Sequence, residues 1–344
     1  MKDDKNRTVT IYDIANRANV SSATVSKVLN KKGSISEETQ KRILDIAAQL
    51  QYKPNPAARY LKTRQTNQIM LSIPNVRDLF FLDMIQVVQS ICRANDYSLL
   101  INSTEEGEAE EIKMLSNLGH NFIDGLILVS VNYTKKHFEK IKKIKRPIIL
   151  CSIGSQVAEE FEMLTDFVGV DSKKGIQQST RHLIEQGHMS IGFVGLDIDN
   201  QTGHERYAGF INTMRECGIE VNNDFVKLGG ADEVFGYQVG LEYCAMAKRP
   251  TALCVSADQI VIGLYKAFQK QGVRVPEDIA IVGMDDTYIS DVITPKLSSV
   301  NLSQIDIGKS ASSLLFQRIN GDESTFKSII YQPKLVIRDS SITR

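Results

Sequence analysis

The stretch TIYDIANRANVSSATVSKVLN, residues 10–30, holds two short helical patterns separated by a three-residue break. In the first pattern, Thr10 is placed to cap a helix and Asp13 follows three residues later, a variant of the capping box. Apolar residues then recur at the spacing of one helix face, at Ile11, Ile14, Ala15 and Ala18. After the break, Ser21 or Ser22 can cap a second helix. Its inward residues are Val25, Val28 and Leu29.

A third helix is predicted over EETQKRILDIAAQLQ, residues 37–51, with Ser36 as its cap. Its apolar stripe consists of Ile43, Ile46, Ala47 and Leu50. Two short helices joined by a three-residue turn, with a third helix beneath them, are typical of a helix-turn-helix domain. The opening stretch therefore predicts an all-α DNA-binding head.

The outward face of the second predicted helix carries small or hydroxylic residues and one cation, namely Ser22, Ala23, Ser26 and Lys27. Small residues let a helix approach base edges, alanine can contact a thymine methyl, and lysine can donate to guanine O6 and N7. A solvated helix that binds nothing could present a similar face. The turn and the charge of this segment favour a surface that recognises the major groove.

The formal net charge of zero conceals an asymmetry along the chain. Residues 1–64 hold 13 Lys or Arg against 6 Asp or Glu, a net of +7, so the remaining residues carry −7. A basic head on an acidic body indicates that the head binds a polyanion. A merely solvated basic surface is the alternative.

Length and composition are typical of a soluble multidomain protein, with 344 residues, 42% hydrophobic and 24% charged. No run approaches ~18 apolar residues and the first residues form no apolar signal segment, so we expect a cytoplasmic protein with no membrane partner. The five cysteines form no C-x-x-C pair and the five histidines show no metal-ligand spacing. Reduced thiols, no bound metal and no cofactor are expected.

The segment YKPNPAARYLK, residues 52–62, predicts a helix of barely two turns, with Asn55 as cap and Pro56 at its first position. Isolated helices shorter than about 12 residues are marginal in water. This helix therefore needs a partner, and Leu61 has little apolar company within the segment itself. A rigid linker that never folds is the alternative.

Together, VTIYDIANRANVSSATVSKVLN and SEETQKRILDIAAQLQYKPNPAARYLK resemble the DNA-binding head of LacI/GalR-type repressors, and the resemblance continues through nearly the whole chain. It implies that Thr10 and Ser21 contact the DNA backbone. It also implies that the second helix reads the major groove through Ser22, Ala23 and Lys27. Ser26 and Asn30 complete the predicted DNA-binding set of this helix.

The same resemblance identifies residues 55–62 as a hinge helix that orders only on DNA. Two such helices, one per subunit, would pack together in the minor groove. There Leu61 would wedge into the central base step and kink the duplex, as apolar side chains do in minor-groove binders. Ala57 and Ala58 permit close approach, and Lys62 can reach a phosphate.

From Thr66 onward, short apolar runs alternate with amphipathic helices. The runs lie at residues 69–73, 97–101, 125–130, 147–152, 167–170, 191–196, 252–257 and 279–284. Helices are predicted at residues 84–94, 109–118, 175–186, 204–217, 236–247 and 259–271. This pattern predicts α/β architecture with parallel sheets covered on both faces. Some eight strands favour two doubly wound lobes over a single sheet.

Polar and aromatic side chains follow several of these runs, and parallel sheets bind ligands at the carboxyl ends of their strands. Phe80 and Phe81 could stack on a flat ring, whereas for Asp258 the capping of the next helix is favoured. One arginine with carboxylates and aromatics suits a polyhydroxylated or heterocyclic ligand. The candidate effector residues are Phe80, Phe81, Asn200, Thr202, Arg206, Asp258 and Asp285.

The body resembles the type I periplasmic-binding-protein-like effector domain of the same family, which implies that Arg206 and Asp285 hold the effector. Two departures stand out. Asp78-Leu79 occupy the place of the family's usual Asn-Pro, and Ala257 occupies the place where many sugar-binding members have Asn.

The predicted domains are a helix-turn-helix head at 1–53, a hinge helix and linker at 54–66, and an effector-binding and dimerisation domain at 67–344. By resemblance, the chain returns to the first lobe near Val300, helix 304–320 follows there, and 328–338 return to the second lobe. The first lobe then comprises about 67–168 plus 300–327, and the second about 169–299 plus 328–344. One face of helix 84–94 could pair subunits or pack in the core: Ile85, Val88, Ile91 and Cys92.

We therefore predict a ligand-responsive repressor that binds double-stranded operator DNA, at a palindrome, as a homodimer; further pairing into a tetramer is left open. The expected effector is a small molecule, a sugar or sugar derivative, with a purine-like ligand or a protein co-repressor as alternatives. An enzyme is not expected and no catalytic residue is assigned, because the G-x-G-x-x-G, G-x-x-x-x-G-K-[ST] and G-x-S-x-G motifs are missing. A solute-binding transport protein would share the body's fold but not the head.

Overall fold

The structure is a computed structural model that describes residues 9–29, 33–52, 65–105, 107–118, 123–154, 161, 163–199 and 201–342. The chain forms two compact units, residues 1–66 and 67–344. Several predicted site residues lie outside the described residues, as does the hinge segment 55–62: Asn30, Ala57, Ala58, Leu61, Lys62 and Asn200.

The first unit contains three helices close to the predicted ones: α1 (Ile11–Ala18), α2 (Ser22–Leu29) and α3 (Glu37–Gln49). The predicted capping box forms, since the Asp13 carboxylate accepts from the N–H of Thr10 at 2.8 Å and from its hydroxyl at 2.7 Å. Ser21 caps α2, because its hydroxyl accepts from the backbone N–H of Thr24 at 3.1 Å. The three helices share one buried core: Ile14, Ala15, Ala18, Val25, Val28, Ile43 and Ala47.

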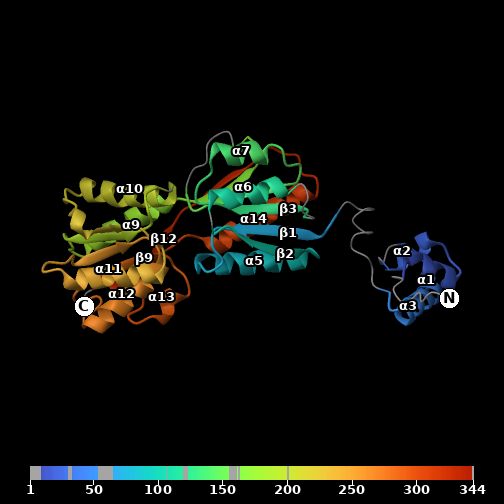
Figure 1. Ribbon diagram of the computed structural model, residues 1–344, viewed down its shortest axis with the longest axis horizontal. Coiled ribbons are helices and arrows are strands. Elements are labelled where there is room, and N and C mark those ends of the chain that lie inside the picture. Colours follow the sequence, from blue (N-terminus) through green and yellow to red (C-terminus); the bar gives the residue numbers. More distant parts are fainter. Residues whose placement is uncertain are drawn as a thin grey trace. The chain divides into compact units, whose positions relative to one another are not determined.

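The second unit is built on two six-stranded sheets, which confirms the predicted pair of doubly wound lobes (Figure 1). The first sheet is parallel throughout, in the order β11-β5-β4-β3-β1-β2. Its strands are β1 (Gln68–Ile73), β2 (Ser98–Ser103), β3 (Gly125–Val129), β4 (Ile148–Ser152), β5 (Asp166–Val170) and β11 (Ser328–Tyr331).

The second sheet has the order β12-β10-β9-β8-β6-β7 and is parallel except for the antiparallel edge strand β12. Its strands are β6 (Ile191–Gly195), β7 (Val226–Leu228), β8 (Ala252–Val255), β9 (Ala280–Asp285), β10 (Ser298–Asn301) and β12 (Lys334–Val336). Strands β7 and β10 and helices α7 (Lys135–Ile141) and α13 (Ile289–Val292) were not predicted from the sequence.

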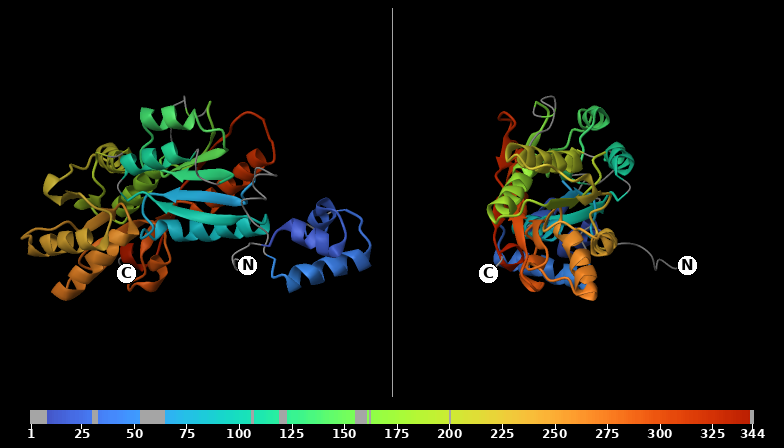
Figure 2. Two further views of the ribbon diagram at one scale, coloured as in Figure 1. Left: turned by 45° about the vertical axis from the view of Figure 1, so that its right-hand side comes forward. Right: turned by 90° about the vertical axis from the view of Figure 1, so that its left-hand side faces the viewer.

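Helices cover both faces of each sheet (Figures 1 and 2). The first lobe carries α5 (Phe80–Ala94), α6 (Glu108–Asn117), α7 (Lys135–Ile141) and α14 (Gln304–Ile319). The second lobe carries α9 (Ser172–Glu185), α10 (Gln201–Glu216), α11 (Glu233–Ala245), α12 (Asp258–Gln271) and α13 (Ile289–Val292). Short 3₁₀ helices lie at Asn223–Phe225 and Asp339–Ser341.

Alternate residues of the central strands face opposite helix layers, as the two-residue period of a strand requires. In β3, Ile127 and Val129 belong to the core cluster that contains α5 and α14, whereas Leu126 and Leu128 belong to the cluster that contains α6. Strands buried on both faces explain the continuous apolar runs in the sequence.

The chain crosses between the lobes three times; the return predicted near Val300 falls slightly later, and the crossing predicted at residue 328 is wrong. Val300 still belongs to the second sheet, where it pairs with Met284 of β9, so the chain returns to the first lobe after residue 301. Residues 328–331 form β11 in the first sheet, beside β5, and only β12 joins the second lobe. Gln332 and Pro333 separate β11 from β12 within residues 328–338. Strand β11 supplies hydrogen-bond partners to the edge of β5, whose backbone groups would otherwise be unpaired.

Helix α14 lies on the first lobe, as predicted for residues 304–320, although most of the second lobe precedes it in the chain (Figure 1). A buried ion pair fastens its end to the sheet. Arg318 Nε and Nη2 donate to the Asp166 carboxylate at 2.7 and 2.9 Å, and their side chains are 9% and 1% exposed. Asp166 also accepts from the backbone N–H of Lys327 at 2.8 Å, so one carboxylate joins α14, β5 and the approach to β11.

The predicted apolar face of α5 packs in the core of its own lobe. Val88 and Cys92 are fully buried there, and Ile85 and Ile91 are partly buried against the same cluster. Across the described residues, no helix combines the length and apolar character needed to span a bilayer.

Candidate DNA-binding surface and effector cleft

Helix α2 separates its core residues from its outward residues as predicted. Val25 and Val28 are buried between the three helices, whereas Ala23 and Lys27 are exposed and Ser22 and Ser26 are half-buried. Thr10 and Ser21 are also exposed, at the starts of α1 and α2. Tyr12 was missed by the sequence analysis although it is 67% exposed on α1; its polar tip and lack of a core role make it a further candidate for DNA contact.

In the second unit, the strand-end residues Arg206 and Asp285 come together at one edge of the second sheet. Arg206 lies in α10 and is 3% exposed, and Asp285 is the last residue of β9 and is 5% exposed. One guanidinium nitrogen of Arg206 donates to the carbonyl of Ser256, and another lies 3.8 Å from Asp285 Oδ1. The backbone of Asp285 has φ = +110°, a strained conformation that is frequent at functional sites.

The electrostatics of this edge are poorly balanced within the protein. Burial lowers the pKa of Arg206, and the carboxylates of Asp285, Asp78 and Glu205 oppose that shift. Burial raises the pKa of Asp285 well above its usual value and also raises that of Asp78, and Arg206 opposes both shifts. Arg206 Nε is buried and has no hydrogen-bond partner. Buried polar groups are normally paired, so this atom indicates a place for a ligand.

Contacts from the first lobe close over this edge. Thr202 Oγ1, buried at the start of α10, donates to the carbonyl of Val131 at 3.4 Å. A Cβ placed on Gly154 would lie 3.1 Å from Glu205 Oε2, so that carboxylate reaches the first lobe. The boundary between the lobes at this edge, called the effector cleft below, therefore has charged residues on both sides, Asp78 on one and Arg206 and Asp285 on the other.

Asp258 is not available to an effector, which corrects its place among the candidates. Its Oδ2 accepts from the N–H and hydroxyl of Thr287 and from Ser290, and its Oδ1 accepts from Ser299 at 2.6 Å. With the side chain fully buried and these four bonds made, the carboxylate is satisfied inside the protein, and burial raises its pKa to about 6. Asp258 fixes the loop after β9 and so positions Asp285.

Phe80 and Phe81 also occupy a different place from the predicted one. Helix α5 begins at Phe80, four residues before the predicted start, and its first turn faces the sheet. Both rings are 1% exposed and pack edge to face at 5.1 Å within the core. Neither ring presents a face on which a ligand could stack.

Three cleft residues were not among the predicted ones. Asp78 precedes α5 and caps it by accepting from the N–H of Phe80 at 3.0 Å. Glu205 Oε2 is buried without a partner, while its Oε1 accepts from Gln201 at 3.0 Å. Gln304 donates to the carbonyl of Asp285 at 2.9 Å, and its own Oε1 is buried without a partner. Gln304 begins α14 after a lobe crossing, so sequence spacing alone could not place it here.

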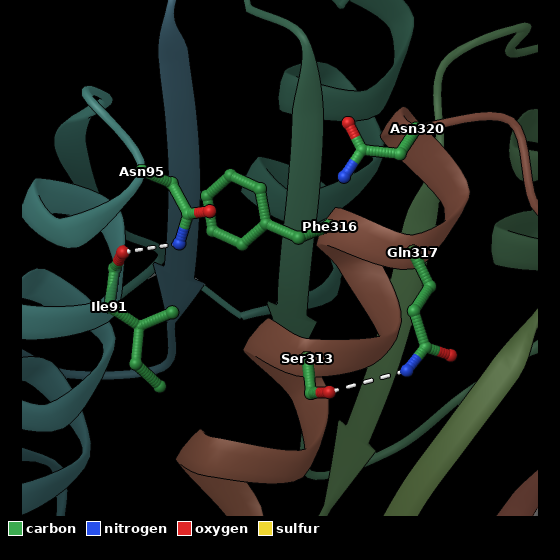
Figure 3. Close-up of a pocket in the computed structure, with 6 residues that line it drawn as sticks. All are labelled: Ile91, Asn95, Ser313, Phe316, Gln317 and Asn320. Atoms are coloured by element: carbon green, nitrogen blue, oxygen red, sulfur yellow. Dashed lines mark hydrogen bonds between the residues drawn. The ribbon is translucent and has the colours of Figure 1, made fainter.

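A separate surface hollow of about 330 Å³ lies between α5 and α14 (Figure 3). Two side-chain amides that line the hollow are hydrogen-bonded to neighbouring residues. Asn95, just after α5, donates to the carbonyl of Ile91 at 2.9 Å, and Gln317 in α14 donates to the Ser313 hydroxyl at 3.4 Å. The remaining lining residues are Phe316 and Asn320. The predicted effector residues are not among its lining residues, so this hollow is distinct from the cleft.

Comparisons with known proteins agree with both parts of the chain. Residues 10–55 match the model of bacterial regulatory proteins of the lacI family, and residues 180–341 match the periplasmic binding protein-like domain. The HTH-type transcriptional repressor PurR of Pasteurella multocida is 31% identical over 336 residues, which cover 97% of this chain and 99% of that protein. Catabolite control protein A of Priestia megaterium is 29% identical, with coverage of 94% and 96%.

Among solved structures, the lac repressor dimer bound to operator and the anti-inducer ONPF aligns with a TM-score of 0.85 at 22% identity, covering 98% of this chain and 100% of that one. This likeness supports the fold. The repressor relative, the head and the two-lobed body lead to one conclusion: the chain belongs to the lacI family of bacterial regulatory proteins and is a DNA-binding transcriptional repressor.

Proposed function

We propose that this repressor binds a palindromic operator as a homodimer and is controlled by a small molecule, a sugar or sugar derivative, held in the cleft at Arg206 and Asp285. The observation that supports this most directly is the buried guanidinium of Arg206, whose Nε has no protein partner. A ligand oxygen would satisfy that donor. The body binds rather than catalyses, and turnover of a sugar or nucleotide by it would contradict this assignment.

Control would work through the angle between the lobes. An effector that contacts Asp78 on one lobe and Arg206 on the other binds the closed arrangement more tightly than an open one. A ligand shifts a conformational equilibrium only by such a difference in affinity. In a dimer, a change in lobe angle changes the spacing of the two segments 54–66, and with it the fit of both heads (residues 1–53) to the operator.

The DNA-reading role of α2 can be tested at Lys27. Lys27→Ala is expected to weaken operator binding by about 1–3 kcal/mol and to relax the preference at one base position, because an exposed lysine on the groove-facing side can donate to a guanine edge. Fluorescence anisotropy on an operator selected from random duplex, and on its single-base variants, measures both effects. An equal loss on every sequence would contradict base recognition. Lys41→Ala on α3 serves as the charge-matched control.

The proposal as a whole predicts a salt-sensitive preference for a palindrome over random duplex, and a change in that preference when an effector binds. Selection from a random library, followed by anisotropy at two salt concentrations with and without sugars and purines, tests both parts. A protein that shows no such preference under any of these conditions is not the regulator proposed here.

A further inference from the structure

We propose that the effector carries a protonated amino group beside its hydroxyls, as in an amino sugar, and that Asp78, Glu205 and Asp285 receive it. This inference rests on the proposed function, because it names the ligand class of the same cleft.

The first argument is the charge of the cleft. Four carboxyl groups act on Arg206, and apart from the internally bonded Asp258 these are Asp285, Asp78 and Glu205, so one positive charge faces an excess of acidic groups. A second arginine, Arg338, does not balance this excess of negative charge. It is already paired with two other carboxylates, Asp286 at 2.8 Å and Asp291 at 3.2 Å. Buried or half-buried carboxylates without matching cations are unfavourable unless a partner arrives.

The second argument is the set of unpaired atoms. Glu205 Oε2 and Gln304 Oε1 are buried acceptors without donors, and Arg206 Nε is a buried donor without an acceptor. Gln304 and Arg206 are each 3% exposed, and Gln304 is held against Asp285 by its amide nitrogen. An ammonium group offers three donors and no acceptor, which suits the acceptors. A neighbouring hydroxyl oxygen can accept from Arg206.

The same arrangement disfavours an anionic effector. Arg206 Nη1 already donates to Ser256 and Nη2 lies 3.8 Å from Asp285 Oδ1, so an anion at the remaining edge of the guanidinium would lie beside a carboxylate. A phosphorylated sugar would also bring negative charge toward Asp78, Glu205 and Asp285. Burial is the main cause that raises the pKa values of Asp285 and Asp78, and Arg206 opposes both shifts, so a second cation would further favour the ionised carboxylates.

Isothermal titration of the full chain with matched pairs tests the inference: glucosamine against glucose, galactosamine against galactose, mannosamine against mannose, and glucosamine 6-phosphate. One amine is expected to bind roughly 10–100-fold more tightly than its hydroxyl counterpart, the difference of a charged hydrogen bond. Its affinity should rise as the pH increases above the ordinary titration range of a carboxyl group, since the pKa values of Asp285 and Asp78 are raised and bound ammonium displaces protons from both groups. Glu205→Gln should reduce the preference for the amine while keeping the weaker binding of the hydroxyl compound.

Two results would overturn the inference. In the first, a neutral or phosphorylated sugar binds as tightly as the matching amine, and Asp285→Asn abolishes that binding. The cleft would then still be the effector site, but the effector would need no amino group. If none of these compounds binds, the melting temperature of ligand-free Asp78→Asn decides. The amide still caps α5, so the melting temperature should rise if the carboxylates repel one another, and an unchanged or lower value contradicts the charge argument.

Discussion

Asp285→Asn is expected to abolish the response to effector while operator binding by the head persists. The carboxylate ends β9 at 5% exposure, 3.8 Å from Arg206, and lies at the edge where both lobes meet. Loss of a charged hydrogen bond to a bound ligand lowers affinity by roughly 10–100-fold. Loss of the charge also removes the carboxylate that most strongly opposes the lowering of the Arg206 pKa by burial. Asparagine is the suitable replacement because it tolerates the positive φ of this position, where alanine would add strain.

The measurement is operator affinity by anisotropy, with and without the effector found in the screen. Asp224→Asn is the control, because Asp224 is exposed at the start of a 3₁₀ helix in the same lobe and away from the cleft contacts. The control should keep the full response. An Asp285→Asn protein that still responds would remove this carboxylate from the effector site.

Asp166→Ala is expected to destabilise the second unit by about 2–3 kcal/mol, because the partly buried guanidinium of Arg318 loses its charge partner and keeps only carbonyl acceptors. The backbone N–H of Lys327 loses its acceptor in the same change. Both interactions lie where α14 and β11 pack on the first sheet, so the packing of these two elements should be weakened most. Urea titration followed by far-UV circular dichroism measures the change in unfolding free energy.

A second ion pair of the same length shows whether burial, and not the distance between the charges, determines the stability that the Arg318–Asp166 pair contributes. The Arg274–Asp278 pair has the same 2.7 Å separation, but its arginine side chain is 68% exposed. Arg274→Ala should therefore cost far less than Asp166→Ala, since exposed ion pairs contribute little. Equal losses from the two changes would show that the buried pair has no special role in holding α14.

The head could be predicted from sequence nearly to the residue because its signals are local. The capping box at Thr10 and Asp13 and the helical spacing of the apolar residues need no knowledge of distant segments. In the body, the apolar strands buried on both faces were found as continuous runs, whereas β10 is buried but reads SSVN and forms no such run. Strand β7 was missed because its three residues are only partly buried, so its pattern resembles that of a loop.

The candidate site was partly predictable for a related reason. Parallel strands share one carboxyl edge, so the sequence could bring Arg206 and Asp285 into one region, and they lie 3.8 Å apart. The sequence could not show that Asp258 is saturated, because the hydroxyls of Ser290 and Ser299 come from 32 and 41 residues further along the chain. The place of Gln304 likewise depends on a lobe crossing that spacing does not reveal.

The interleaved order of the two lobes has a consequence for biosynthesis. When the ribosome has made residues 68–170, five of the six strands of the first sheet exist, but α14 and β11 have not been synthesised. The apolar side chains that α14 later covers are then without their partner, and the edge of β5 has no neighbouring strand. We expect the nascent first lobe to remain prone to aggregation, and to need a chaperone, until residues 304–331 have emerged, after most of the second lobe.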